Sequence, residues 1–221
     1  MTESLNFPWA VALPALLLTA VTVPALVAAD LRDWRPGRYL FKPLAALGFL
    51  WLAWLLRSAD SAYACWLLAG LVLCALGDLL LMFEAERSFL AGLVAFLCGH
   101  LLYIVAFLQI NTTVAGMAIS LLPVAILVAG SLRWLLPHLQ GPMRLAVPAY
   151  ILVIAAMLIA AGGTLGSPGA ALVLAGAWGF ALSDLAVARR QFVRRSIVNG
   201  LWGTPLYFGS QMLLAASIAF H

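Results

Sequence analysis

Two aspartates stand where a charge is costly. Asp78 lies near the end of an apolar run over residues 62–83, and Asp184 lies near the end of another over residues 168–188. Of the eight acidic residues, only these two fall inside hydrophobic segments. A carboxylate within a membrane-spanning segment is expensive and marks a functional site, so a partner for it is expected. The two residues are therefore candidates for one catalytic pair.

Two carboxyl groups in a poorly hydrated cleft resist ionising together, so one keeps its proton while the other stays charged. The protonated group then donates a proton, and the charged group activates water. The alternative is structural: hydrogen bonds, or Lys42, neutralise each acid and hold the helices together. The presence of two matched acids, Asp78 and Asp184, favours the acid–base interpretation.

Lys42, His100 and Tyr103 are candidates for lining the same cleft. Lys42 lies near the end of an apolar run, level with the acids, where it would bind a phosphate or tune a carboxylate. The alternative is a lysine that snorkels to the interface. His100 and Tyr103 lie three residues apart, on one face of a helix, and would position substrate or relay protons. A hydrogen-bonded packing role for His100 stays open.

A polar stripe marks the last apolar run. Asn199, Gly203, Tyr207 and Gln211 recur every four residues and so share one helix face. Such a face is typical of a wet or substrate-lined surface, with hydrogen bonding between helices as the alternative. We take Asn199, Tyr207 and Gln211 as substrate-binding candidates.

The sequence lacks the motifs of several other common kinds of catalytic site. The chain has only three histidines, widely separated, which argues against a three-histidine zinc site. The three cysteines lie in apolar runs without metal-binding spacing. Neither a glycine-rich phosphate loop nor a Gly-x-Ser-x-Gly motif is present. We therefore expect a site without metal or cofactor.

The composition defines the class. With 65% hydrophobic and 9% charged residues, the chain fits a polytopic α-helical membrane protein. The first run has no basic residue before it and no small-residue cleavage site, which indicates a retained span. Short loops leave no room for a soluble domain, so we expect a single membrane domain over residues 1–221. Eight spans are predicted, at residues 9–29, 39–56, 62–83, 88–109, 114–136, 143–162, 168–188 and 199–219.

The basic residues predict the orientation. Eleven of the twelve flank the odd-numbered loops, and only Arg57 lies on the other side. Because basic loops stay cytoplasmic, both termini should face away from the cytoplasm. Asp78 and Asp184 then lie five and four residues from the cytoplasmic ends of their spans, roughly 6–8 Å inside the boundary. The net charge of +4 indicates contact with a lipid bilayer rather than with nucleic acid.

The two halves of the chain are similar at an offset of 104 to 106 residues. Pro43 corresponds to Pro148, Gly70 to Gly176, Asp78 to Asp184, Gly99 to Gly203 and Tyr103 to Tyr207. This predicts two parallel four-helix repeats, about 1–112 and 113–221, with the site between them. Chance similarity in sequence rich in leucine and alanine is the alternative.

These motifs, taken in order, resemble the YhhN-like lysoplasmalogenase family. The resemblance covers most of the chain and rests on five segments. They are Lys42-Pro43, Gly77-Asp78-x-x-Leu81-Met82, Gly92-x-x-x-Phe96-x-x-Gly99-His100-x-x-Tyr103, Phe180-x-x-Ser183-Asp184 and Tyr207-x-x-x-Gln211. Position 204 departs from the repeat, because Thr204 stands where His100 would correspond.

The resemblance implies an eight-span hydrolase acting on the vinyl ether bond of lysoplasmalogens. Its products would be a fatty aldehyde and glycerophosphoethanolamine or glycerophosphocholine. The two aspartates of the family match Asp78 and Asp184. A bacterial inner membrane is the expected location, with the endoplasmic reticulum as the alternative, and a lysophospholipid is the expected substrate. Two alternatives remain: an intramembrane aspartyl protease, and a proton-coupled transporter of small molecules or lipids.

Overall fold

The computed structural model describes residues 7–83, 85–194 and 196–221, and its long elements are all α-helices. Several helices contain proline, which is tolerated in membrane helices because neighbouring groups satisfy the freed backbone. The helices are α1 (Trp9–Leu31), α2 (Arg35–Leu56), α3 (Ala62–Leu80), α4 (Glu86–Phe107), α5 (Val114–Leu135), α6 (Met143–Gly163), α7 (Ala170–Ala188) and α8 (Ile197–Ser217).

Seven of these helices are long and apolar enough to cross a membrane, among the described residues. The chain is thus an all-helical integral membrane protein. Helix α8 is the exception because its polar stripe, with Asn199 and Gln211, lowers its mean hydropathy. The stripe is nevertheless buried, since Asn199, Tyr207 and Gln211 all have little exposed surface.

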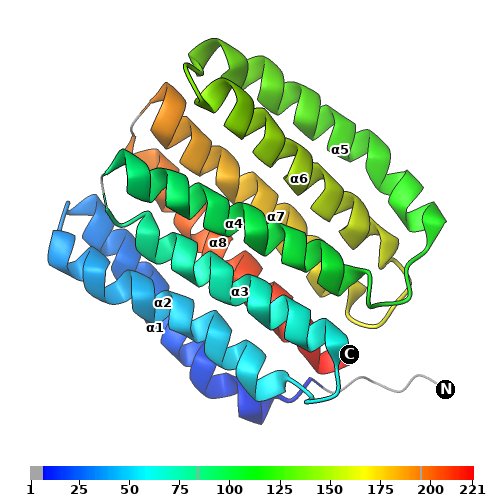
Figure 1. Cartoon of the computed structure of the whole chain (residues 1–221). Coiled ribbons are helices and arrows are strands. Elements are labelled where there is room, and N and C mark those ends of the chain that lie inside the picture. The colour runs from blue at the N-terminus through cyan, green and yellow to red at the C-terminus, as the bar shows by residue number, and fades with distance from the viewer. Residues whose placement is uncertain (1–6, 84, 195) are drawn as a thin grey trace.

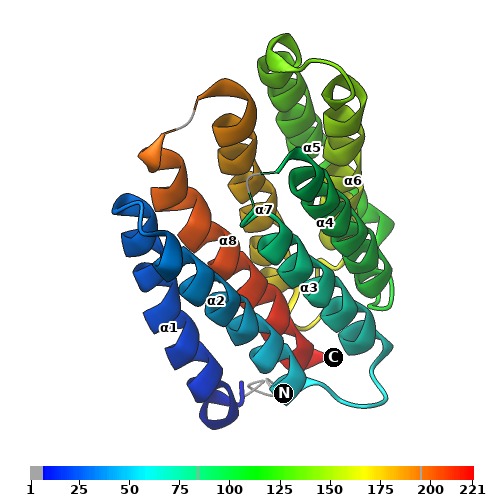
Figure 2. The same cartoon turned by 60° about the vertical axis from the view of Figure 1, so that its left-hand side comes forward.

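Sequential helices pair as hairpins, α1 with α2, α3 with α4, α5 with α6, and α7 with α8 (Figure 1). Further contacts join α2 to α3, α6 to α7, α2 to α8 and α4 to α6. Helix α8 also packs against α1 and α3, whereas α5 lies at the edge beside α6 (Figure 2). The polar stripe of α8 is therefore turned toward other helices.

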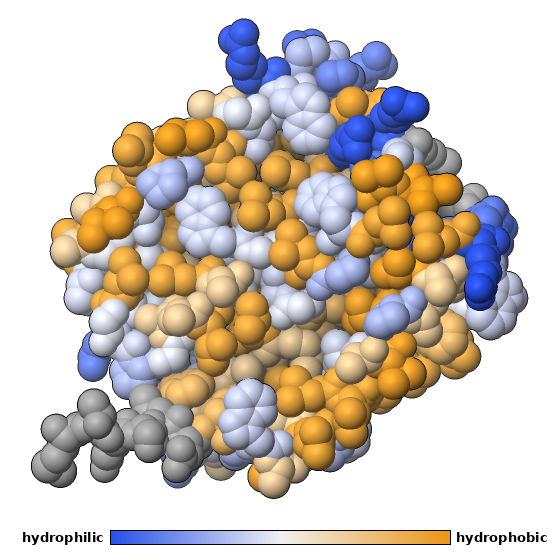
Figure 3. Space-filling view, turned by 180° about the vertical axis from the view of Figure 1, so that it is seen from behind, coloured by the Kyte–Doolittle hydropathy of each residue, from blue (hydrophilic) through white to orange (hydrophobic). Residues whose placement is uncertain are grey.

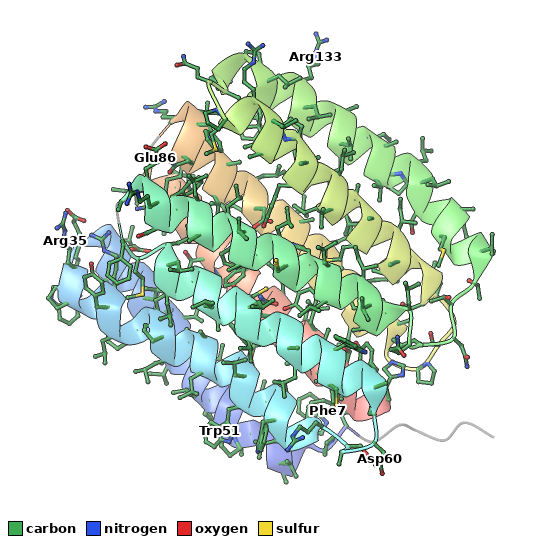
Figure 4. All side chains as sticks on the ribbon, in the orientation of Figure 1. Phe7, Arg35, Trp51, Asp60, Glu86 and Arg133 are labelled. Carbon is green, nitrogen blue, oxygen red and sulfur yellow. The ribbon has the colours of Figure 1, made fainter. Side chains whose placement is uncertain are left out.

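Charged residues gather at the ends of the bundle. Arg35, Glu86 and Arg133 lie at one end, and Phe7 and Asp60 lie at the other (Figure 4). Between the ends, apolar and weakly polar side chains dominate the surface, and the most hydrophilic residues gather mainly along two edges of one face (Figure 3). This distribution suits a lipid-facing belt with one basic end.

The helix bounds differ from the predicted spans in three places that matter for the site. Helix α2 begins at Arg35 rather than at residue 39, so Arg35 and Arg38 belong to its start. Helix α3 ends at Leu80 because the chain turns at residues 81–83, so Asp78 lies two residues from the helix end rather than five from the end of the span. Helix α1 continues to Leu31, so Asp30, which the predicted span excluded, belongs to its last turn.

The chain after α7 continues as a π-helix, Arg189–Val193, before α8 begins. Single π-turns are frequent at functional sites. This turn carries Arg189 and Arg190, two of the basic residues that predicted the orientation. Arg195, another of them, lies outside the described residues.

Candidate active site

One cavity of about 620 Å³ holds both aspartates. Asp78 from α3 and Asp184 from α7 line it, together with Lys42 from α2 and Tyr207 from α8. Its walls between α4, α5 and α6 are apolar and include Leu93, Leu127, Ile151 and Ile154. A cavity of this size, mostly apolar with a few convergent polar groups, is typical of a small-molecule site.

Asp78 is held as an ion pair. Its side chain is 4% exposed, and the Lys42 ammonium lies 3.2 Å from its Oδ1. The Tyr207 hydroxyl donates a hydrogen bond of 2.6 Å to its Oδ2. A nearby cation and a donated hydrogen bond both stabilise the carboxylate form, because they interact with its negative charge. These two contacts therefore favour the carboxylate form of Asp78, whereas its burial opposes that form.

Among the described residues, no lysine or arginine pairs with Asp184. The Tyr150 hydroxyl donates to its Oδ2 over 3.0 Å, and Nε2 of His100 lies 3.9 Å from the same oxygen. His100 Nδ1 lies 2.7 Å from the Phe96 carbonyl oxygen, which can only accept, so Nδ1 carries the proton. In a neutral ring Nε2 then presents a lone pair toward Asp184.

A lone pair facing a carboxyl group favours the protonated acid, which can donate, over the carboxylate, which it repels. Nε2 of His100 is buried and has no hydrogen-bond partner among the described residues. A protonated Asp184 would donate a hydrogen bond to Nε2 if the two side chains moved slightly closer than their 3.9 Å separation. The two aspartates thus share one cavity but have opposite electrostatic surroundings.

The remaining candidates form a network behind the cavity wall. The Tyr103 hydroxyl donates to Oε1 of Gln211 over 2.9 Å, and Nε2 of Gln211 donates to the Tyr207 hydroxyl over 3.2 Å. The Tyr207 hydroxyl in turn donates a hydrogen bond to Asp78. Neither Tyr103 nor Gln211 is among the residues lining the cavity. Their contacts fit support of Tyr207 better than direct contact with a ligand.

Asn199 lines the cavity, but its amide also has protein partners. Its Oδ1 accepts from Arg189 over 2.9 Å, and its Nδ2 donates to the Arg194 carbonyl over 3.0 Å. The residue ties the π-helical turn to the start of α8. It therefore shapes the rim of the cavity.

Tyr150 was not predicted as a site residue, and the arginines were taken only as indicators of membrane orientation. Tyr150 is the single tyrosine of α6 and follows Pro148 by two residues, so the repeat alignment, which places Lys42 opposite Val147, could have drawn attention to this face. Arg38 and Arg190, read only as topology markers, line the cavity as well. No cluster of three potential metal ligands occurs in the described part of the chain.

Fold and site together define a class: a helical membrane protein with a carboxyl pair in a cavity near one end of the bundle. The YhhN family model matches residues 37–218, and the chain belongs to that family. It is 32% identical to human lysoplasmalogenase TMEM86B over 212 residues, covering 92% of this chain and 84% of that protein. It is 29% identical to a lysoplasmalogenase of Mycobacterium bovis over 161 residues, covering 70% and 60%. No solved structure matches it.

Proposed function

We propose that this protein is a lysoplasmalogenase that hydrolyses the vinyl ether bond of lysoplasmalogens with Asp78 and Asp184 as an acid–base pair. The products are a fatty aldehyde and glycerophosphoethanolamine or glycerophosphocholine. The observation that carries the proposal is the pair itself: two carboxyl groups with opposite surroundings in one cavity. The names of its relatives support the substrate.

In the first step Asp184 is the acid. It transfers its proton to the β-carbon of the vinyl ether, which leaves an oxocarbenium ion on the α-carbon and a carboxylate on Asp184. The Tyr150 hydroxyl, already donating to Asp184, stabilises that new charge. Both the carboxylate of Asp78 and that of Asp184 then stabilise the cation, much as paired carboxylates do in glycosidases.

In the second step Asp78 is the base. It accepts a proton from water as the water oxygen attacks the α-carbon, and a hemiacetal forms. The carboxylate of Asp184 then removes the hemiacetal hydroxyl proton, and protonated Asp78 donates to the departing glycerol oxygen. Both groups finish in their starting states. Lys42 keeps Asp78 ionised between turnovers.

The membrane arrangement is part of the proposal. We infer eight spans, because α8 lies among the seven apolar helices although its own stripe is polar. The basic end of the bundle faces the cytoplasm and both termini face away, in a bacterial inner membrane. One membrane domain, residues 1–221, then places the site near the cytoplasmic interface, where the head group reaches water.

The packing supports two parallel four-helix repeats. Four contacts recur with their mates: α1–α2 with α5–α6, α2–α3 with α6–α7, α3–α4 with α7–α8, and α2–α8 with α4–α6. The packing of α1 and α3 against α8 has no comparable mate in the other half. Glycines make the close approaches in both halves, since a Cβ on Gly70 would meet Tyr103 at 2.5 Å and one on Gly176 would meet Leu214 at 2.7 Å. The site then lies between the repeats, at matched positions on α3 and α7.

The test is aldehyde release from a synthetic lysoplasmalogen by the purified protein. We expect Asp78→Asn and Asp184→Asn each to lower the rate by about 10²–10⁴-fold, the usual contribution of a general acid or base. Robust hydrolysis by either variant would contradict the pair. Peptide cleavage, or substrate flux into proteoliposomes without hydrolysis, would instead favour the protease or the transporter.

A further inference from the structure

Arginines from two distant parts of the chain line the polar end of the cavity. Arg35 and Arg38 come from the start of α2, and Arg190 comes from the π-helical turn after α7. Arg35 lies at the same end of the bundle as Glu86, which also lines the cavity (Figure 4). The carboxylate of Asp30 lines this rim as well, so three arginines and two acids lie there.

The sequence offered Lys42 as a phosphate ligand, but its ammonium is engaged with Asp78 at 3.2 Å. Arg38 lies one helical turn before Lys42 and is three-quarters buried. Its guanidinium pairs with Asp33, and its Nε lies 3.6 Å from Asp30. Arg190 is exposed and interacts electrostatically with Asp30. Guanidinium groups recognise phosphate oxygens through paired N–H donors.

The spacing from the acids to the arginines matches the substrate. Arg38 lies four residues, roughly 6 Å along the axis of α2, from Lys42, which pairs with Asp78. Arg190 follows Asp184 by six residues, roughly 9 Å along the chain direction of α7. Seven bonds separate the β-carbon of the vinyl ether from phosphorus, roughly 8 Å in a chain that advances about 1.2 Å per bond. A reacting carbon between the aspartates thus places the phosphate at the arginines.

We propose that Arg38 and Arg190, with Arg35 beside them, form an anion subsite for the phosphodiester of a lysophospholipid head group. The substrate class rests on the proposed function. The subsite sets the depth of the lipid, because a held phosphate leaves the vinyl ether level with Asp78 and Asp184 and directs the chain toward the apolar wall between α4, α5 and α6. A lipid without the phosphate lacks this contact, so its vinyl ether is not held at the depth of the two aspartates.

The test measures binding, so that it stands apart from hydrolysis. The purified full chain in maltoside detergent is titrated with two saturated ether probes, 1-O-hexadecylglycerophosphoethanolamine and 1-O-hexadecylglycerol. We expect the first to bind more tightly. Arg190→Ala should weaken its binding about tenfold, and Arg38→Ala with Arg190→Ala about a hundredfold, as for charge-assisted hydrogen bonds. Binding of hexadecylglycerol should not change, which also shows that the variants are folded.

Arg133→Ala is the matched control, because Arg133 is exposed at the same end of the bundle and does not line the cavity. Unchanged binding of the phosphorylated probe in the double variant would overturn the subsite. Equal weakening of both probes would also overturn it and assign the arginines to folding. Competition by inorganic phosphate, without any advantage of the phosphorylated probe, would assign the arginines to free phosphate. If binding depends on the phosphate but no aldehyde is released, the proposed hydrolase activity is contradicted and the anion subsite stands.

Discussion

The proposed repeat gives Asp78 and Asp184 equivalent places in the two halves, yet their neighbours differ in charge. In the proposed repeat each aspartate meets one residue from the second helix of its own half and one from the fourth helix of the other half. For Asp78 these are Lys42 and Tyr207, and for Asp184 they are Tyr150 and His100. In this proposal a duplicated frame supplies two similar carboxyl groups, and the flanking residues give them different tasks.

The sharpest difference between the halves is the cation. Lys42 has Val147 as its counterpart in the second half, so only Asp78 has a lysine beside it. We expect Lys42→Met to lower aldehyde release about a hundredfold, because Asp78 would then take up a proton and lose its function as base. Lys42→Arg should retain most of the rate. Equal losses in both variants, measured as kcat, would show that the charge is not what matters.

The second difference is the imidazole, since Thr204 corresponds to His100. His100→Phe should reduce kcat about tenfold, the size of one hydrogen bond, because Asp184 would lose the lone pair that favours its proton. His138→Phe is the control: its Nδ1 also bonds a carbonyl four residues back, at Trp134, but it is exposed. An unaffected His100→Phe enzyme would remove the imidazole from the mechanism.

Each aspartate also accepts a hydrogen bond from a tyrosine, Asp184 from Tyr150 and Asp78 from Tyr207. Tyr150→Phe should slow turnover several-fold, because Asp184 loses the donor that stabilises its carboxylate after proton transfer. Tyr207→Phe should have a smaller effect, since Asp78 keeps Lys42. Tyr63→Phe removes a buried hydroxyl whose partner is Ser217 and serves as control. The reverse order of the two effects on kcat would contradict the division of roles.

The halves should be alike in packing. Gly70→Ala and Gly176→Ala should each destabilise the protein by about 1–3 kcal/mol, because the new Cβ meets Tyr103 or Leu214 too closely. Gly130→Ala is the control, with nothing within 4 Å of the added Cβ. Thermal unfolding in detergent measures the effect, which should barely change turnover per folded molecule. Destabilisation at only one of the two glycines would weaken the case for a repeat.

Much of this arrangement could be predicted from residue spacing, and some could not. An acid inside an apolar run is visible in the sequence, and so is its mate at a regular offset, which led to Asp78 and Asp184. The approach of His100 to Asp184 joins helices of different halves, and no local pattern reports it. Tyr150 stands in an alanine-rich helix without a periodic polar partner.

The role of the arginines was hidden for another reason. Arginines beside membrane spans already follow from topology, so their number gives no sign of a ligand. Only the cavity, which Arg35, Arg38 and Arg190 line, distinguishes these three arginines from the others.

The opposite protonation of the two aspartates is the central claim, and infrared difference spectroscopy tests it most directly. The wild-type protein should show the C=O stretch of a protonated carboxyl group near neutral pH, shifted in D₂O. We expect this band to disappear in Asp184→Asn and to persist in Asp78→Asn. A band that persists in Asp184→Asn and disappears in Asp78→Asn would reverse the assignment of acid and base and contradict the account.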